Sequence, residues 1–529
     1  MTNNNSEHNQ MVAERGTSNR KRILKAAGIA SIASLLFYFI SFLREAVVSM
    51  YFGISADLDA LLLAQMIPLF LAGTIASTIQ AVIVPLYTEM SEDTAEQSEF
   101  INKVYTLFLL FMIGITAILA LITPWMVQGI GSGLEDSQKK LLLPLFWLLL
   151  LFVPFKALSG FKRALFYAEK DFWSPGISPA IMAVVTMISV WFGSLRWGIY
   201  SLAFGIALGS AVELLVTGWL LARRGIRLRL TLALQDRRLR KLFSLSLPLA
   251  IGSVSTGTIV IIDRMMASTL SVGSISALGY AERINGMMLL ALGSLQMAVF
   301  PFFAEQAGLA DRKQLIKDFK QTISLICFIL APVSLIVIFF NRPLVALLFQ
   351  RGSFDAQATA VTGDALVGYV IGLIPMAVGF IYVRIIQALQ INWLIGFVGF
   401  LNPFIKIMLN WLMIPFLGHT GIALATSGMY FVGLLLLMFG LGRYVNMNSD
   451  IKFIRFFIKI GIGLLAMVLV IYASALLPLS QNDWNGLIYL CPLLFFSIVT
   501  YWLACYFLNV EEAIMLLRVF EKLRLRIVN

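Results

Sequence analysis

The sequence predicts an all-α polytopic membrane protein with fourteen transmembrane helices. Of its 529 residues, 59% are hydrophobic and 13% are charged, whereas soluble domains contain about 25% charged residues. The mean hydropathy of +0.87 agrees with a surface that faces lipid. A hydrocarbon core of about 30 Å requires about 20 apolar residues per helix. Apolar segments of that length recur along the whole chain, and the second half resembles the first.

Three short segments of the first half return in the second half, in the same order and at offsets of 216 to 221 residues. Each match alone is weak, but three in one order indicate an internal repeat. Many transporters are built from such repeats, so the repeat predicts transport. The matches are 80–89 with 296–305, 161–163 with 382–384, and 198–203 with 418–423.

The polarity of the chain and the lengths of its apolar segments divide it into two tails, two lobes, a linker and an extra pair of spans. Residues 1–25 form a polar tail without the order of a signal peptide. Residues 26–222 hold six spans of the first lobe, and the basic segment 223–241 links them to six more in 242–442. Residues 443–508 supply two extra spans, and 509–529 form a basic amphipathic tail. The expected spans are 26–50, 59–88, 102–127, 141–166, 174–195, 198–222, 242–270, 276–304, 315–340, 361–388, 392–416, 419–442, 453–477 and 486–508.

The positive charges predict the orientation of the chain. Short cytoplasmic loops collect Lys and Arg, and the 223–241 linker is the most basic connection between spans. It is therefore expected in the cytoplasm, and an even number of spans places both termini there too. The net charge of +12 is explained by separate loops of this kind, which argues against a nucleic-acid partner. The basic residues of the linker are Arg223, Arg224, Arg227, Arg229, Arg237, Arg238, Arg240 and Lys241.

Few residues are suited to catalysis, metal binding or a cofactor. The two histidines are His8 in the polar tail and His419 in a turn, and the three cysteines lie in apolar segments without metal-like spacing. The loops are short. A membrane enzyme is therefore disfavoured, and neither cofactor nor metal is expected.

Ionic side chains occur at related ends of the two repeats. A charge at the bilayer centre costs roughly 2.5 to 3.5 kcal/mol on insertion scales, so charges inside spans usually face a wet cavity or a partner. The planar fork of arginine suits the oxygens of a diphosphate. We therefore expect an anionic head group in a cleft shared by the lobes. The candidates for binding it are Arg44, Glu45, Asp59, Glu282 and Arg283.

Five short motifs lie at 43–47, 51–53, 59–60, 280–301 and 348–354. Together they resemble the MviN/MurJ-type lipid flippases of the multidrug/oligosaccharidyl-lipid/polysaccharide exporter superfamily. The resemblance covers about 26–508. It implies two six-helix lobes around a V-shaped central cleft, plus an extra helix pair. It also implies alternating access that moves an undecaprenyl-pyrophosphate-linked saccharide, a lipid II-like peptidoglycan precursor, from the inner to the outer leaflet of the bacterial cytoplasmic membrane.

Residue by residue, the resemblance assigns Arg44, Glu45, Asp59 and Arg283 to the substrate cavity. Two further arginines of the family pattern are replaced. Tyr38 and Ala72 stand at those positions. A different polyprenyl-linked glycan, such as an exopolysaccharide repeat unit, therefore remains an alternative substrate.

The resemblance also bears on energy coupling. Sodium-binding members use an aspartate of the seventh helix with polar groups of the eleventh and twelfth helices, and Asp263, Asn410 and Thr426 correspond. Lys406 occupies a position where those members have a neutral ligand. Its ammonium is expected to pair with Asp263 and replace the cation, because hard-cation sites need oxygen ligands. No sodium site is therefore expected.

Other functions on the same fold remain to be weighed. A drug or metabolite exporter is disfavoured by the arginines, because cationic-drug exporters favour acidic and aromatic cavities. A scaffold that recruits cell-wall or polysaccharide synthesis enzymes finds little support in a leader of about 22 residues. The expected partners are a lipid-linked oligosaccharide and the membrane, with cell-wall or polysaccharide synthesis enzymes as further candidates. A single chain carries both lobes, so a monomer is expected to suffice.

Overall fold

The protein is all-α throughout the residues that its computed structural model describes. They fall into two compact units, Met1–Thr269 and Leu270–Asn529. Within lipid, a helix satisfies its backbone hydrogen bonds internally, which is why a chain this apolar is built of long helices. The described residues are 3–89, 94–130, 133–134, 136–231, 242, 244, 246, 257–308, 312–445, 451–475 and 484–515.

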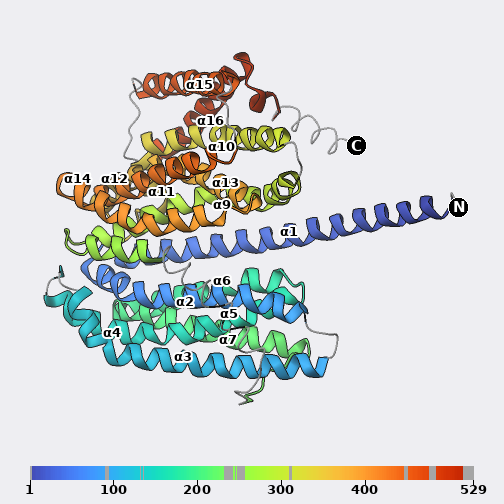
Figure 1. The fold of residues 1–529 in the computed structure, drawn as a ribbon. Coiled ribbons are helices and arrows are strands. Elements are labelled where there is room, and N and C mark those ends of the chain that lie inside the picture. Colours follow the sequence, from blue (N-terminus) through green and yellow to red (C-terminus); the bar gives the residue numbers. More distant parts are fainter. Residues whose placement is uncertain are drawn as a thin grey trace. The chain divides into compact units, whose positions relative to one another are not determined.

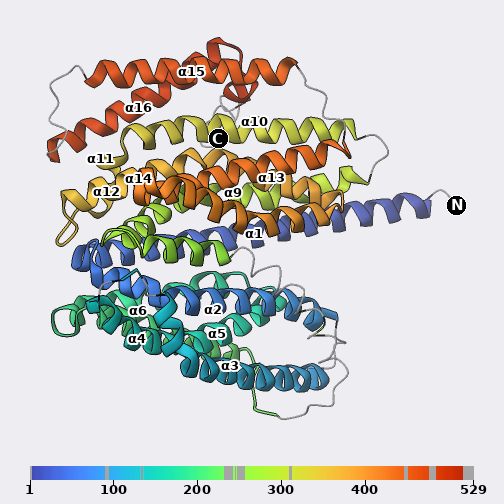
Figure 2. The same ribbon diagram turned by 60° about the vertical axis from the view of Figure 1, so that its left-hand side comes forward.

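The first unit is a bundle of helices lying side by side (Figures 1 and 2). Helix α6 packs against α1 and α7, while α2 packs against α4 and α5. A helix at 257–267 also belongs to this unit, and Arg264 Nη1 donates to the carbonyl oxygen of Leu62 in α2 at 2.6 Å. The helices are α1 (Asn3–Phe52), α2 (Ala56–Glu89), α3 (Thr94–Ile130), α4 (Asp136–Leu150), α5 (Phe152–Ala168), α6 (Trp173–Trp197) and α7 (Tyr200–Arg223).

The second unit contains the remaining described helices. Helix α12 packs against α9 and α14, α13 packs against α9, α10 and α14, and α15 pairs with α16. The hydroxyl of Tyr501 in α16 donates to the carbonyl oxygen of Phe328 in α10 at 3.0 Å, which fixes the last helix to the unit. The helices are α9 (Ser274–Ala307), α10 (Lys313–Phe339), α11 (Asn341–Phe349), α12 (Ala356–Ile371), α13 (Leu373–Ala388), α14 (Asn392–Gly442), α15 (Ile451–Ala475) and α16 (Trp484–Phe507).

The internal repeat is visible in the backbone. Gly198, which ends α6, has φ 50° and ψ −133°, and Gly418 inside α14 has φ 54° and ψ −131°. L-residues with a side chain rarely adopt this conformation, so glycine is required. At Gly418 the chain reverses and divides α14 into two antiparallel segments. Lys170 and Gln390, each in the turn after a helix, also share φ 60°. The two halves thus turn in the same way at corresponding positions.

The helices agree with the expected spans. Ten helical segments of the described chain are long and apolar enough to cross a membrane. One of them, Asn392–Gly442, contains two expected spans because of the reversal at Gly418. Helix 257–267, α9 and α16 occupy the places of the seventh, eighth and fourteenth. The prediction of an all-α polytopic membrane fold is confirmed, and fourteen spans are consistent with it. Helix α1 begins at Asn3, inside the polar leader.

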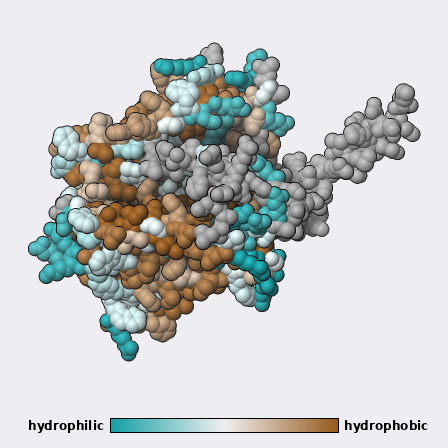
Figure 3. All heavy atoms as spheres, turned by 60° about the horizontal axis from the view of Figure 1, so that its bottom comes forward, coloured by the Kyte–Doolittle hydropathy of each residue, from teal (hydrophilic) through white to brown (hydrophobic). Residues whose placement is uncertain are grey.

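The surface of the bundles is strongly apolar. Leu195 is 92% exposed, Phe416 82% and Phe192 77%, which would be costly in water for contiguous groups of large side chains. Figure 3 shows hydrophobic residues over much of one face and hydrophilic residues towards its margins. Such a surface fits a hydrocarbon environment.

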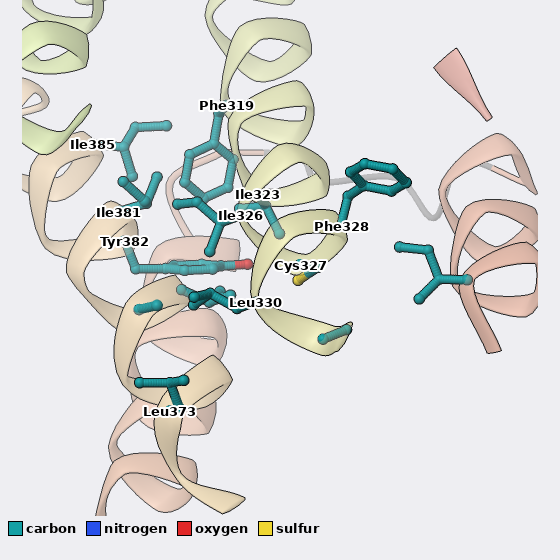
Figure 4. Packing of buried hydrophobic residues seen from close by; sticks show 14 of the residues in the cluster. Phe319, Ile323, Ile326, Cys327, Phe328, Leu330, Leu373, Ile381, Tyr382 and Ile385 are labelled. Carbon is teal, nitrogen blue, oxygen red and sulfur yellow. The ribbon is translucent and has the colours of Figure 1, made fainter. Parts of the chain in front are cut away.

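Each unit has its own packed core, and one aromatic position recurs in both. In the first unit, the ring centroid of Phe161 in α5 lies 5.7 Å from that of Phe108 in α3. In the second, the ring of Tyr382 in α13 lies 4.9 Å from that of Phe319 in α10, edge to face (Figure 4). Residues 161–163 and 382–384 are one of the sequence matches, so the repeat extends to side-chain packing. Interior packing of this kind is a main source of helix association in lipid.

Candidate functional site

The first-unit candidates lie on either side of the turn between α1 and α2. Arg44 Nε donates to Glu45 Oε1 at 3.1 Å, and Arg44 Nη2 contacts the same oxygen. The Glu45 side chain is 8% exposed and that of Arg44 13%. A guanidinium has five N–H donors, so the carboxylate orients Arg44 while leaving donors for a further acceptor.

Asp59 is buried in the first turn of α2. Its N–H donates to the carbonyl oxygen of Ser55 at 3.0 Å, and the Ser55 hydroxyl accepts from the N–H of Leu58 at 3.3 Å. A carboxylate at this position interacts favourably with the positive end of the helix dipole. Asp59 therefore helps to begin α2 as well as being a site candidate.

The second-unit candidates for the head group lie near the start of α9, the counterpart of α2. Glu282 and Arg283 are both exposed, whereas the neighbouring Ile284 and Asn285 are buried. Successive residues of a helix point about 100° apart, so the two charges present different directions. The predicted substrate residues thus belong to both units.

Lys406 lies in a fully buried polar site inside the second unit. Because the chain reverses at Gly418, the two segments of α14 lie antiparallel to each other. Lys406 Nζ in the first segment donates to the carbonyl oxygen of Ile422 at 2.7 Å and to Thr426 Oγ1 at 2.5 Å, both in the second segment. Asn410, one turn further along, is also fully buried. The structure thus brings together Lys406 and Thr426, two of the predicted coupling residues. Asp263 lies in the helix at 257–267, in the first unit.

The structure also contains an ionic cluster that was not predicted. Lys156 Nζ in α5 donates to Glu213 Oε2 in α7 at 2.8 Å, and Lys162 Nζ donates to the carbonyl oxygen of Leu214 at 2.9 Å. Gly218 leaves room for the second lysine, because a Cβ there would lie 2.6 Å from Nζ. Both lysines and Glu213 fall inside expected spans, so a survey of every charge within a span, not only those near span ends, would have found them.

Outside the spans, Asp171 joins α5, α6 and α7. Its Oδ1 accepts from the backbone N–H groups of Trp173 and Ser174 at the start of α6. Its Oδ2 pairs with Arg224 at the end of α7 at 2.6 Å. Burial alone would raise the pKa of Asp171, but the hydrogen bonds from Ser174 and Trp173 and the Arg224 guanidinium outweigh it and hold the pKa below its usual range.

Comparison with known proteins agrees with the fold and the membrane character. The family model described as lipid II flippase MurJ matches residues 48–495. A probable lipid II flippase MurJ of Vibrio cholerae is 26% identical, covering 80% of this chain and 83% of its own length. The lipid II flippase MurJ of Burkholderia cenocepacia is 24% identical, covering 84% and 88%.

Solved structures show the same architecture. A lipid II flippase MurJ in an inward closed conformation has a TM-score of 0.76 at 22% identity, covering 89% of this chain and 97% of its own. An inward-facing multidrug resistance MATE family transporter of the MOP superfamily has a TM-score of 0.66 at 13% identity, covering 79% of this chain and 100% of its own. The family model extends from the end of α1 into α16, and the chain therefore belongs to the MurJ family of lipid flippases, a family of transporters and not of enzymes.

Proposed function

We propose that this protein flips lipid II, or a closely similar undecaprenyl-pyrophosphate-linked saccharide, from the inner to the outer leaflet of the bacterial cytoplasmic membrane by alternating access. The observation that carries the proposal is the family match over 48–495 together with an arginine–glutamate pair inside the first span. The polar head group would follow a cationic path while the prenyl tail stays in lipid. This avoids transferring the diphosphate charge into hydrocarbon.

Arg44 and Arg283 are the proposed ligands of the diphosphate. Both are arginines in apolar helices, and Glu45 and Glu282 stand directly beside them in the sequence. Glu45 holds Arg44 in place through Nε and Nη2. Charge-assisted hydrogen bonds from guanidinium groups to phosphate oxygens are roughly twice as strong as neutral ones. Asp59, buried at the start of α2, is a further proposed site residue.

Replacement of two family arginines favours a second candidate substrate. Tyr38 is 41% exposed on α1, and Ala72 is fully buried in α2. Neither side chain carries the positive charge that an arginine would bring to a diphosphate. An exopolysaccharide repeat unit on the same polyprenyl carrier is therefore the alternative. The two substrates share the diphosphate and differ in the sugar.

Flipping in reconstituted vesicles tests the proposal. Purified protein is placed in liposomes with fluorescent lipid II, or with another undecaprenyl-pyrophosphate glycan, and outward movement is followed by quenching of externally exposed label. We expect transport by the native protein and loss of most of it in Arg44→Ala and Arg283→Ala. Arg196→Ala is the matched control, because Arg196 is exposed at the end of α6. Normal transport of every substrate by both cavity variants would exclude the cationic path.

The proposed orientation places both termini and the 223–241 linker in the cytoplasm. The support is the concentration of Lys and Arg in that linker. Single cysteines at position 227 and near each terminus, introduced into a variant without the native three, should react with an impermeant maleimide only after cell lysis. Reaction in intact spheroplasts would contradict the proposed orientation.

We further infer that one chain is the working unit. Transport by liposomes that contain a single copy of the protein would test this.

A further inference from the structure

Each half of the chain carries an arginine at the same position of the internal repeat. Arg163 in α5 and Arg384 in α13 are the last residues of the matched segments 161–163 and 382–384. The aromatic residues that begin these segments pack in corresponding places of the two cores. Helix α5 packs against α2, and α13 packs against α9, the counterpart of α2. The repeat therefore gives both arginines equivalent positions in their units.

Both arginines lie inside membrane-spanning helices, near the ends that the proposed orientation places at the cytoplasmic face. Arg163 is roughly 8 Å of helix before Ala168, where α5 ends, and Arg384 is roughly 6 Å before Ala388, where α13 ends, at 1.5 Å per residue. Arg44 and Arg283 lie towards the outer ends of their spans in the same orientation. Each lobe thus has an arginine on the inner-leaflet side as well.

The positive charges of these two arginines are not neutralised within the protein. Neither Arg163 nor Arg384 forms an ion pair with a carboxylate among the residues that the structure describes. Arg384 Nη1 donates to a neutral acceptor, Gln387 Oε1, at 3.0 Å. Arg44, by contrast, contacts the carboxylate of Glu45. A charge inside an apolar span is costly, and those that are retained usually serve a function.

The Nε atoms of both arginines are buried and donate no hydrogen bond within the described ranges, although each residue as a whole is half-buried. An arginine that only extends to the membrane interface keeps its polar head in water. A buried donor without an acceptor carries a desolvation penalty. The planar guanidinium group presents donors side by side that match two oxygens of one phosphate. A phosphate group is therefore a fitting acceptor at both positions.

The two arginines also lie beside related helices. In the first unit, a Cβ at Gly160 would lie 2.6 Å from the Cβ of Ala76 in α2 and 3.8 Å from Arg163 Nη2, so this guanidinium group lies at the contact between α5 and α2. In the second unit, the Arg384 guanidinium carbon lies 5.9 Å from the ring centroid of Phe300 in α9. Helices α2 and α9 also hold proposed substrate residues. The arginines thus border the same helices as the proposed site.

We propose that Arg163 and Arg384 are further substrate-binding residues, one in each unit, which bind diphosphate oxygens of the lipid-linked substrate on the inner-leaflet side. They would act where the head group is loaded, whereas Arg44 and Arg283 would act nearer to the outer side. The inference rests on the proposed function and orientation. It adds to them a pair of anion ligands that the repeat supplies.

Binding of undecaprenyl pyrophosphate to the purified protein tests the pair. Affinity is measured by native mass spectrometry, with phosphatidylglycerol as a second ligand that carries a single phosphate. We expect Arg163→Gln and Arg384→Gln each to weaken undecaprenyl pyrophosphate binding about tenfold, as for the loss of one charge-assisted hydrogen bond, and to leave phosphatidylglycerol binding unchanged. Arg342→Gln is the matched control, because Arg342 is an exposed arginine paired with Asp364. Native affinity in both variants, or an equal loss for phosphatidylglycerol, would overturn the proposal.

Lysine variants cover the case in which the glutamine variants misfold. Arg163→Lys and Arg384→Lys keep the charge but lack Nε and the planar fork, so they should fold and still bind undecaprenyl pyrophosphate several-fold more weakly than the native protein. Native affinity in folded lysine variants would show that the guanidinium group has no binding role.

Transport kinetics separate a binding role from a structural one. In the vesicle assay, the lysine variants should require a higher lipid II concentration for half-maximal flipping and should reach the native maximal rate, because a loading residue acts before the head group crosses. An unchanged half-saturating concentration would contradict the loading role. If the native protein moves no lipid-linked glycan, the proposed function fails, while the comparison with undecaprenyl pyrophosphate still decides whether Arg163 and Arg384 bind a diphosphate.

Discussion

Lys406 and Thr426 lie on the two antiparallel segments of α14, and the ammonium nitrogen of the first is 2.5 Å from the hydroxyl oxygen of the second. The same ammonium also binds the carbonyl oxygen of Ile422. A cation thus occupies a site lined by oxygen acceptors, which is what a bound metal ion would require. The positive charge here is covalently attached to the protein.

Replacing Lys406 should therefore create a dependence on sodium. In Lys406→Asn the carbonyl oxygen of Ile422 and the hydroxyl of Thr426 lose their donor, and a hard cation can take its place. We expect the melting temperature of the native protein to be equal in sodium and potassium, and that of the variant to rise in sodium. Lys139→Asn, at a partly exposed pair with Asp136, serves as control. A folded Lys406→Asn protein indifferent to sodium would contradict the prediction.

The glycine turns should be sensitive to any side chain. Gly198→Ala and Gly418→Ala place a Cβ at φ near 50°, a conformation that costs about 1 to 3 kcal/mol for a non-glycine residue. Each should lower the stability of the purified protein by about this amount in thermal unfolding. Gly396→Ala, within α14 and with no atom near its Cβ position, should have little effect. Equal loss in all three would show that the turn geometry is not the cause.

The Asp171 carboxylate should give stability that depends on pH. The pKa of Asp171 is below its usual range in the folded state. The ionised carboxylate therefore stabilises the fold fully above the unfolded pKa of about 3.9, and this stabilisation is lost as the pH falls through the folded pKa. Asp171→Asn should melt lower than the native protein at neutral pH, and the difference should shrink on acidification below about pH 4. Asp136→Asn, at a highly exposed carboxylate, should show no such trend. A difference that is constant with pH would contradict the assignment.

The last helix should loosen when its buried hydrogen bond is removed. Tyr501→Phe leaves the carbonyl oxygen of Phe328 without its donor, at a cost of roughly 1 to 3 kcal/mol. Hydrogen exchange in α16 should become faster. Tyr506→Phe, on an exposed part of the same helix, is the control. Unchanged exchange in Tyr501→Phe would mean that ring packing alone holds α16.

The sequence was sufficient for the class of fold because membrane helices follow from apolar length alone. It also predicts the repeat, because 198–203 matches 418–423 in sequence, and Gly198 and Gly418 share their backbone angles. It placed Lys406 and Thr426 together only through a family resemblance. The expected spans 392–416 and 419–442 imply a turn near Gly418, but they do not show which side chains of the two segments face each other.

The buried pair of Lys156 and Glu213 was missed for a different reason. Each residue stands alone in an apolar segment, 57 positions from the other. Only the packing of α5 on α7 makes them partners. Hydropathy shows that such charges are expensive, but not which neighbour compensates them.

The hydrogen bond from Arg264 to Leu62 joins residues that are 202 positions apart. A ribosome makes the chain from its first residue onward, so α2 is inserted long before the helix at 257–267 exists. The first six spans must therefore lie in the membrane as an incomplete unit until that helix has been made and binds α2. Release of the chain at the linker would leave this body permanently without its last element, and separately expressed halves cut at 223–241 should assemble poorly unless both are made in the same cell.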